Sequence, residues 1–231
     1  MKRFLSIDWD FFNSASMTYR CTHFPSGNEE LPESVQDFIW DRFYDFGLKC
    51  SVQIDSPAYK MFLKICREFS PSRPVYVADS HRHIYDFINI WTSFHPEHLI
   101  EVYNIDFHHD LYCYRTREHR VNCGNWGNML KEIRPNTDFF WVKREDSDIN
   151  VIEDVEAPVH HMTLSELDKK FRGNFVDSFD GLYICRSSMW SPPHLDRLFT
   201  KGIRLLKSTR PDCSIYCEEG ILTPRKYEVS V

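Results

Sequence analysis

The sequence feature that most constrains the fold is an apolar stretch, residues 99–106, that runs directly into alternating charged side chains. Asp106, His108 and Asp110 follow one another at intervals of two residues. Side chains alternate faces along a β-strand, so this spacing predicts that the three point to one side. Burying two carboxylates and an imidazole together is costly unless they bind something positive. The stretch therefore predicts a buried strand that carries a divalent-metal site at its end.

The composition fits one globular domain and excludes several other classes of protein. The chain has 231 residues, 42% of them hydrophobic, which predicts a single α/β domain over residues 1–231. A net charge of −6 predicts no broad basic surface for nucleic acid. Asp8 and Asp10 interrupt the apolar start that a secretory signal needs, and no long apolar run follows. We therefore expect a cytoplasmic protein, outside membranes, whose eight cysteines are free thiols.

Strand-like and helix-like segments alternate along the chain. Expected strands cover residues 2–12, 75–78, 99–106, 138–142, 155–160, 180–185 and 214–217. Expected helices cover residues 35–44, 56–69, 82–94, 126–133, 164–171 and 193–206. Residues 13–32 are expected to form a long loop, and Thr163 with Glu166 resembles a capping box. The alternation predicts a three-layer α/β/α fold with a mainly parallel central sheet.

Further metal-competent side chains stand at other strand ends, where open α/β sheets bind ligands. Asp8 and Asp10 close the first strand at a spacing of two, and His81 follows the strand over residues 75–78. Mn²⁺ prefers carboxylate oxygens with a few imidazoles, and four carboxylates exceed what one Zn²⁺ needs. We therefore predict two Mn²⁺ ions per chain, held by Asp8, Asp10, His81, Asp106, His108 and Asp110.

This pattern resembles the ureohydrolase superfamily of arginases and deacetylases, in which Asp-x-His-x-Asp, Asp-x-Asp and a lone histidine bind a binuclear manganese centre. The segments 5–12, 106–110 and 191–194 more closely resemble the UPF0489 family, which includes peptide arginases. The resemblance spans residues 4–194 and implies an arginase/deacetylase-like fold. It also implies hydrolysis of arginine side chains in a ribosomal precursor peptide to ornithine and urea, within natural-product biosynthesis.

The resemblance also suggests roles for residues outside the six ligands. Asn125 lies in a segment, residues 123–127, that looks like the Ser-Gly-Asn of arginases and is a candidate for substrate binding. Glu219 resembles the glutamate that grips the guanidinium group. Asp110 is a candidate partner for the proton of the attacking water. His109 is a candidate catalytic group, although strand alternation places it away from the metals, in a supporting or packing role.

The sequence leaves several alternatives open. Arginases carry Asp-x-Asp late in the chain, so Asp177 and Asp180 could replace Asp8 and Asp10. His83 is a rival for the role of His81, and Trp126 stands where arginases have a proton-shuttling histidine. Other histidines are candidate proton shuttles or ordinary surface and core residues: His160, His161 and His194.

Two other functions compete with a peptide arginase. A zinc deacylase of the same superfamily keeps Asp-x-His and often a second histidine, which Asp106, His108 and His109 match equally well. Asp110 and His81 argue against it, because a site for one ion does not need them. A non-catalytic binding protein on this fold is the third hypothesis, which retention of all six candidate ligands opposes. The sequence does not decide the oligomeric state.

Overall fold

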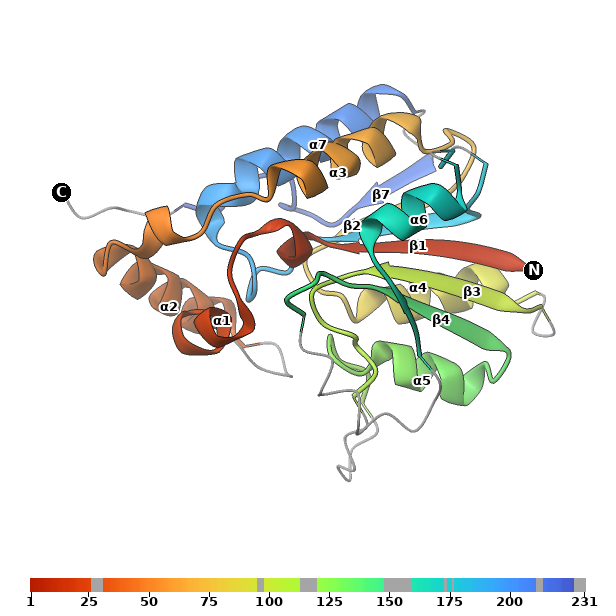
Figure 1. Ribbon diagram of the computed structural model, residues 1–231, viewed down its shortest axis with the longest axis horizontal. Helices are drawn as coiled ribbons and strands as arrows, with labels where there is room; N and C mark the ends of the chain where they lie inside the picture. The colour runs from red at the N-terminus through yellow and green to blue at the C-terminus, as the bar shows by residue number, and fades with distance from the viewer. Residues whose placement is uncertain are drawn as a thin grey trace.

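A computed structural model describes residues 1–25, 31–94, 98–112, 120–147, 159–172, 174–175, 177–210 and 214–226. Its centre is one sheet of seven parallel strands in the order β5-β4-β3-β1-β6-β2-β7 (Figure 1). The strands are β1 (Lys2–Asp8), β2 (Val75–Ala78), β3 (Ile100–Ile105), β4 (Thr137–Val142), β5 (His160–Met162), β6 (Gly181–Cys185) and β7 (Ile215–Cys217). Since the strands are parallel, their carboxyl ends all meet at one edge of the sheet.

Helices lie between most consecutive strands, as parallel pairing requires, and the link from β4 to β5 includes residues 148–158, outside the described part of the chain. The α-helices are α1 (Met17–His23), α2 (Glu33–Asp45), α3 (Ser56–Glu68), α4 (His83–Thr92), α5 (Trp126–Ile133), α6 (Leu164–Lys170) and α7 (Asp196–Ser208). Short 3₁₀ helices are η1 (Trp9–Phe12), η2 (Leu48–Ser51) and η4 (Pro193–Leu195). A search of the described residues for a helix with the length and apolar character of a membrane span found none.

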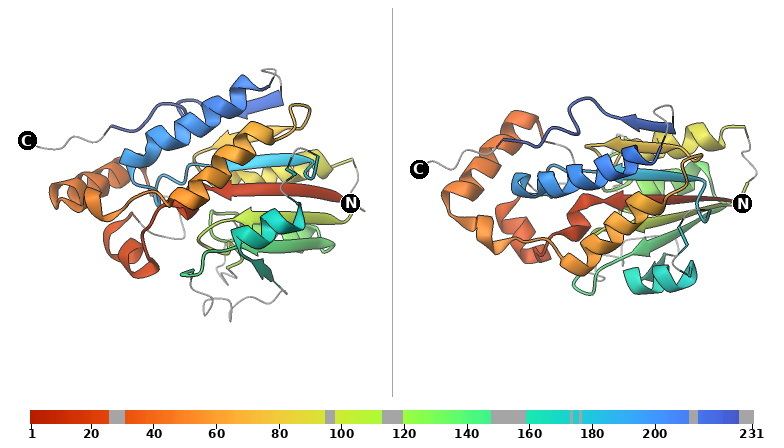
Figure 2. Two further views of the ribbon diagram at one scale, coloured as in Figure 1. Left: turned by 45° about the horizontal axis from the view of Figure 1, so that its top comes forward. Right: turned by 90° about the horizontal axis from the view of Figure 1, so that it is seen from above.

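Two hydrophobic clusters, one on each face, make the fold three-layered. On one face α3, α6 and α7 pack against the sheet through Phe62, Leu167 and Phe199. On the other face α4 and α5 contribute Phe87 and Leu130. Figure 2 shows these two helical layers on opposite sides of the strands. Burying apolar side chains on both faces is the main favourable contribution to such a fold.

The carboxyl ends of the strands are covered by the segment between β1 and α3. Figure 1 shows α1 and α2 beyond the end of β1, at the side opposite the N-terminus. Their aromatic side chains pack together, with Phe24 against Trp40 and Phe43. This cover removes the strand ends from bulk water and so determines where buried polar side chains can gather.

Most expected elements are confirmed, and the differences have local causes. The strand expected over residues 2–12 ends at Asp8, because its carboxylate accepts the amide N–H of Asp10 and starts η1. The loop expected over residues 13–32 contains α1, which Ser16 caps by accepting from the amide of Tyr19. The capping box of Thr163 and Glu166 is confirmed.

Two further expectations need a shift in their bounds. Residues 155–158 of the strand expected over residues 155–160 lie outside the described residues. The observed strand β5 starts at His160. The expected helix over residues 193–206 is divided into η4 and α7. The predicted three-layer α/β/α class with a parallel sheet is confirmed.

Candidate metal centre

The two strands that carry the predicted ligands end in the same way. Asp8 closes β1 and accepts the amide N–H of Asp10 at 2.9 Å, while Asp106 follows β3 and accepts that of His108 at 2.8 Å. Each carboxylate therefore turns the chain just beyond its strand. The prediction that Asp106, His108 and Asp110 share the face of a strand is wrong, since β3 ends at Ile105. The turn, not strand alternation, brings each pair to the edge of the sheet.

A first group of candidate ligands surrounds His81. This histidine comes shortly after the end of β2, at the carboxyl ends of the strands. Its Nδ1 lies 3.2 Å from Asp8 Oδ2, 3.1 Å from Asp106 Oδ2 and 2.9 Å from Asp110 Oδ2. On the other side of the ring, Nε2 lies 2.6 Å from Ser6 Oγ, which can accept the Nε2 proton. That hydrogen bond leaves the Nδ1 lone pair directed at the carboxylates, as a metal ligand requires.

A second group lies beside the first and shares Asp106 with it. His108 Nδ1 is 3.2 Å from Asp10 Oδ2 and 3.8 Å from Asp106 Oδ1. Asp106 thus presents Oδ2 to His81 and Oδ1 to His108. Two sets of side chains are close enough together to hold an ion each. One set is Asp8, His81 and Asp106, and the other is Asp10, Asp106 and His108. One carboxylate that faces two adjacent ligand groups is what a pair of bridged ions needs.

The chemistry of these donors fits divalent cations. His108 Nε2 and Asp10 Oδ1 are buried without a hydrogen-bond partner among the described residues. Buried polar atoms almost always have one, so two in one cluster need an explanation. Ligands of an octahedral ion lie about 3 Å from their neighbours, since each is about 2.1 Å from the metal. The separations around His81 Nδ1 match that spacing.

The electrostatics of the cluster also demand positive charge. Burial, with the charges of Asp10 and Asp106, raises the pKa of Asp8 to about 7. Burial, with the charges of Asp110 and Asp10, raises the pKa of Asp106 to about 8. Burial lowers the pKa of His81, but the surrounding carboxylates more than reverse this and hold it well above its usual value. Without a cation, the site can lower its charge only by binding protons.

Arg20 gives the second group a fixed positive charge. Its side chain is fully buried and donates to Asp10 Oδ2 at 2.9 Å, to the carbonyl of Asp10 and to Asn13. The guanidinium also lies 4.0 Å from the ring centre of Phe107. Burial would raise the pKa of Asp10, but Arg20 and His108 lower it to about 2. Asp10 is therefore the carboxylate of this site that stays ionised most easily.

Asp110 is held in place from α5. Trp126 Nε1 donates to Asp110 Oδ2 at 2.6 Å, and the backbone of Asp110 has a φ of 56°, in the left-handed region. Gly127 lies so close that an added Cβ would be 3.0 Å from the Asp110 carbonyl and nearer still to Leu111. Trp126 and Gly127 thus let the helix approach the turn and orient the carboxylate.

A small polar cavity of about 180 Å³ reaches His81 of the first group. His81 lines it together with Asp79, Glu218 and Trp190. Glu218 Oε2 accepts the amide N–H of Asp79 at 2.7 Å, and the ring of Trp190 lies 4.4 Å from that of His108. Asp79 is paired with Arg186 at 2.8 Å, so Glu218 and the ring of Trp190 are the groups here that suit a cationic planar group.

The structure places the remaining predicted residues as follows. Glu219 lies in an exposed turn, and its neighbour Glu218, which directly follows β7, lines the cavity instead. Asn125 uses its side chain within its own loop, accepting from the amide of Asn122 and donating to the carbonyl of Arg120. The proposed substrate contact of Glu219 therefore has a better-placed candidate one residue earlier.

His109 and the other histidines lie outside the two ligand groups. His109 Nδ1 accepts from the amide of Leu111, and its ring packs beside Tyr112 and Trp141. Burial lowers its pKa to about 4. His160 stacks on Phe140, and His194 contacts Tyr44 and Val52. His161 is exposed, and His83 is half-buried outside both groups.

The alternative pair for the Asp-x-Asp position is not at this edge. Asp180 precedes β6 at the opposite end of the sheet, where it binds Lys2 and Arg73, and Asp177 is exposed. Asp8 and Asp10 are therefore the carboxylates that complete the cluster.

Sequence reasoning missed four residues of the site. Ser6 carried a usable signal, because a hydroxyl two positions before Asp8 in an apolar strand shares its face. Trp126 and Glu218 adjoin residues that the sequence did single out. Nothing in the polar context of Arg20 indicates that it is buried. Its role depends on the tertiary structure alone.

Comparisons with protein-family models, with curated proteins and with solved structures found no match to this chain.

Proposed function

We propose that this chain is a manganese-dependent hydrolase acting on the guanidino group of arginine within a peptide. The observation that carries the proposal is the pair of ligand groups joined by Asp106, with Asp8, His81 and Asp110 on one side and Asp10 and His108 on the other. Four carboxylates and two imidazoles are the donor set that two hard divalent ions prefer. The resemblance to the arginase pattern supports the same assignment.

The reaction would add water to the guanidinium carbon and break its bond to the side-chain nitrogen. That nitrogen gains a proton and leaves as the ornithine amine, while the carbon leaves as urea. When bound, the two ions would lower the pKa of a shared water and stabilise negative charge near the reacting carbon. Asp110, held by Trp126, is the carboxylate that we assign to accept a proton from that water.

Substrate recognition would use the mouth of the cluster. Glu218 supplies negative charge beside His81, and Trp190 supplies an aromatic face. A guanidinium is planar, pairs with carboxylates and stacks on indole rings. These two side chains would hold the substrate group over the ligands. We could trace no residues matching the arginase clamp for a free amino acid, which favours arginine in a peptide.

The alternative function is a zinc deacylase. The number and identity of the metal ions bound per chain distinguish it from the proposed arginine hydrolase. The deacylase requires one ion per chain, so Asp110 and His81 would have no ligand role. The position of His81 Nδ1, 2.9 Å from Asp110 Oδ2 and 3.1 Å from Asp106 Oδ2, favours the binuclear alternative. Two manganese ions per chain with cleavage at arginine support our proposal, and one zinc with acetyl-lysine cleavage would replace it.

The direct test is incubation with Mn²⁺ and a set of arginine-containing peptides. Mass spectrometry should show a loss of CH₂N₂ at arginine, and a colorimetric assay should show an equal amount of urea. Free arginine and lysine-containing peptides serve as comparison substrates. No loss of CH₂N₂ from any peptide by fully metal-loaded protein would contradict the proposal.

A further inference from the structure

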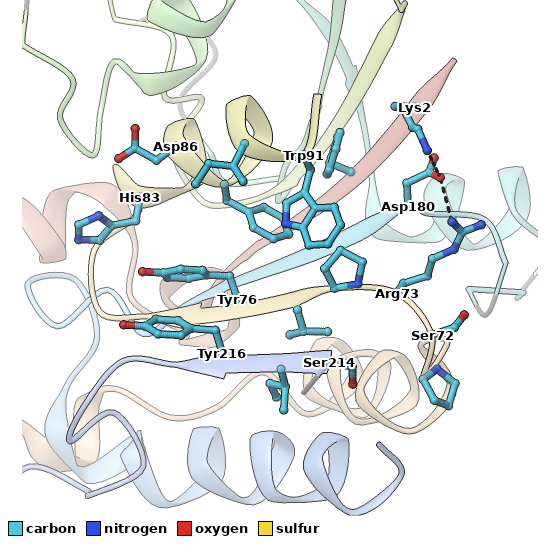
Figure 3. A pocket seen from close by; sticks show the side chains of 17 residues that line it. Lys2, Ser72, Arg73, Tyr76, His83, Asp86, Trp91, Asp180, Ser214 and Tyr216 are labelled. Atoms are coloured by element: carbon cyan, nitrogen blue, oxygen red, sulfur yellow. Dashed lines mark hydrogen bonds and ion pairs between the residues drawn. The ribbon is translucent and has the colours of Figure 1, made fainter. Parts of the chain in front are cut away.

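A second and larger cavity, of about 870 Å³, lies between α4 and strands β2 and β7 (Figure 3). Its floor contains Tyr76 of β2 and Tyr216 of β7, whose ring centres are 4.5 Å apart. Phe87 and Trp91 line it from α4. The cavity is thus an aromatic hollow on the α4 face of the sheet.

Large apolar side chains are exposed around this hollow. Tyr216 is 55% exposed, Trp91 53% and Ile90 66%, and Phe94, just after α4, is 89% exposed. Parallel sheets are normally covered on both faces, so an exposed ring on β7 marks incomplete cover. Grouped apolar exposure of this kind marks an interaction surface. The hollow over β2 and β7 and the projecting end of α4 lie side by side.

The two ends of the cavity carry opposite charge. Figure 3 places Asp86 and His83 at one end, and Lys2, Arg73 and Asp180 at the other. Lys2 and Arg73 share the single carboxylate of Asp180, at 3.2 Å each, which leaves that end net positive. Asp86 is exposed at the other end.

We propose that this face is a two-fold interface between two copies of the chain. A two-fold axis through the middle of the hollow exchanges its ends, so Asp86 of each copy meets Lys2 and Arg73 of the other. The same rotation leaves the direction across the strands unchanged, so α4 of one copy lies against α4 of the other. An isologous contact requires such a self-complementary surface. This inference does not depend on the proposed catalytic function.

Sedimentation velocity of the full chain over a concentration series tests the proposal. The chain should be a dimer, and Trp91→Glu should raise the dissociation constant at least about 30-fold, as for a central interface aromatic. Phe46→Glu changes an aromatic that is 71% exposed just after α2, and should leave the dimer intact. Circular dichroism melting should show all three proteins equally folded. A monomeric wild type, or a Trp91→Glu variant as dimeric as wild type, overturns the proposal.

Charge reversal tests the two-fold arrangement itself. Asp86→Lys should weaken the dimer about tenfold, because each new lysine faces Lys2 and Arg73 of the other copy. Adding Arg73→Glu to the same chain should restore most of the lost affinity. A double variant that is no tighter than Asp86→Lys alone would overturn this pairing of the ends. A stable monomer would instead leave the hollow to a different protein or a small ligand.

Discussion

The central sheet has an amino edge, where its parallel strands begin, and a carboxyl edge, where they finish. These two edges use the same residue types in opposite ways. At the amino edge Asp180 accepts from Lys2, from the amide of Arg3 and from Arg73, and these side chains remain partly exposed. At the carboxyl edge Asp8 and Asp106 are buried, their pKa values are raised, and carboxylates outnumber fixed cations. An aspartate at a strand terminus is therefore not informative by itself.

What distinguishes the edges is whether the protein supplies its own counter-charge. The amino edge does so and gains modest stability from exposed ion pairs. At the carboxyl edge, Arg20 is the only permanent cation within hydrogen-bond distance of the four candidate ligand carboxylates, in the part of the chain that the structure describes. Uncompensated buried charge costs stability and persists where function requires it. The following predictions test this contrast between the edges, beginning with the largest expected effect.

Asp106→Asn should abolish the binding of both manganese ions, because Asp106 faces both ligand groups. Urea release should fall by at least about 100-fold, and the fold should be retained. Asp180→Asn at the opposite edge is the matched control and should keep both metal and activity. Metal content by mass spectrometry and a urea assay measure the two effects. Full activity in Asp106→Asn would reject the site.

Trp126→Phe should weaken manganese binding without removing a ligand. Loss of the indole N–H frees the Asp110 carboxylate from its 2.6 Å hydrogen bond. Supporting contacts of this kind are worth about 10- to 100-fold in metal affinity. Calorimetric titration with Mn²⁺ measures the change, and Trp91→Phe provides a control at an exposed indole. An unchanged affinity would show that Trp126 does not orient Asp110.

Glu218→Gln should raise KM about tenfold while the manganese content stays the same. A carboxylate-to-guanidinium contact is charge-assisted, and its loss weakens substrate binding. Glu219→Gln, one residue away in the exposed turn, should leave KM unchanged. Steady-state kinetics with an arginine peptide compares the two variants. A raised KM in Glu219→Gln with an unchanged KM in Glu218→Gln would assign the substrate contact to Glu219 instead.

Stability of the metal-free protein should fall as pH rises from about 4 toward 8. The folded-state pKa values of Asp8, about 7, and Asp106, about 8, exceed the usual 3.8, so the folded state holds protons that the unfolded state has lost. Thermal melting in a chelator should show the fall, and saturating Mn²⁺ should remove it. Stability that rises with pH in the chelator would contradict the charge imbalance at this edge.

Sequence reasoning could predict the sheet and most of the residues that gather in the candidate metal centre, because both leave local patterns. The apolar strands stand out from their surroundings, and Asp8, His81 and Asp106 come directly at their ends. The turn after β3 was not predictable from alternation, since it depends on Asp106 bonding the amide of His108. The helix α1 is short and polar, and its Arg20 is buried against Asp10 and Asn13, which lie outside the helix.

Contacts between distant segments explain the remaining errors. Glu218 and Glu219 are equivalent in a sequence, and only the end of β7 decides which one lines the cavity. Tyr216 and Trp91 reveal a shared surface only after β7 joins β2. Local chemistry was therefore visible in the sequence, and the partners of each group were not.

The central claim is that two ligand groups joined by Asp106 bind a pair of cations. A crystal structure with manganese, measured at the manganese absorption edge, tests it most directly. We predict two anomalous peaks, one among Asp8, His81, Asp106 and Asp110 and the other among Asp10, Asp106 and His108. A crystal saturated with manganese that shows no peak between Asp8 and Asp106 would contradict the claim.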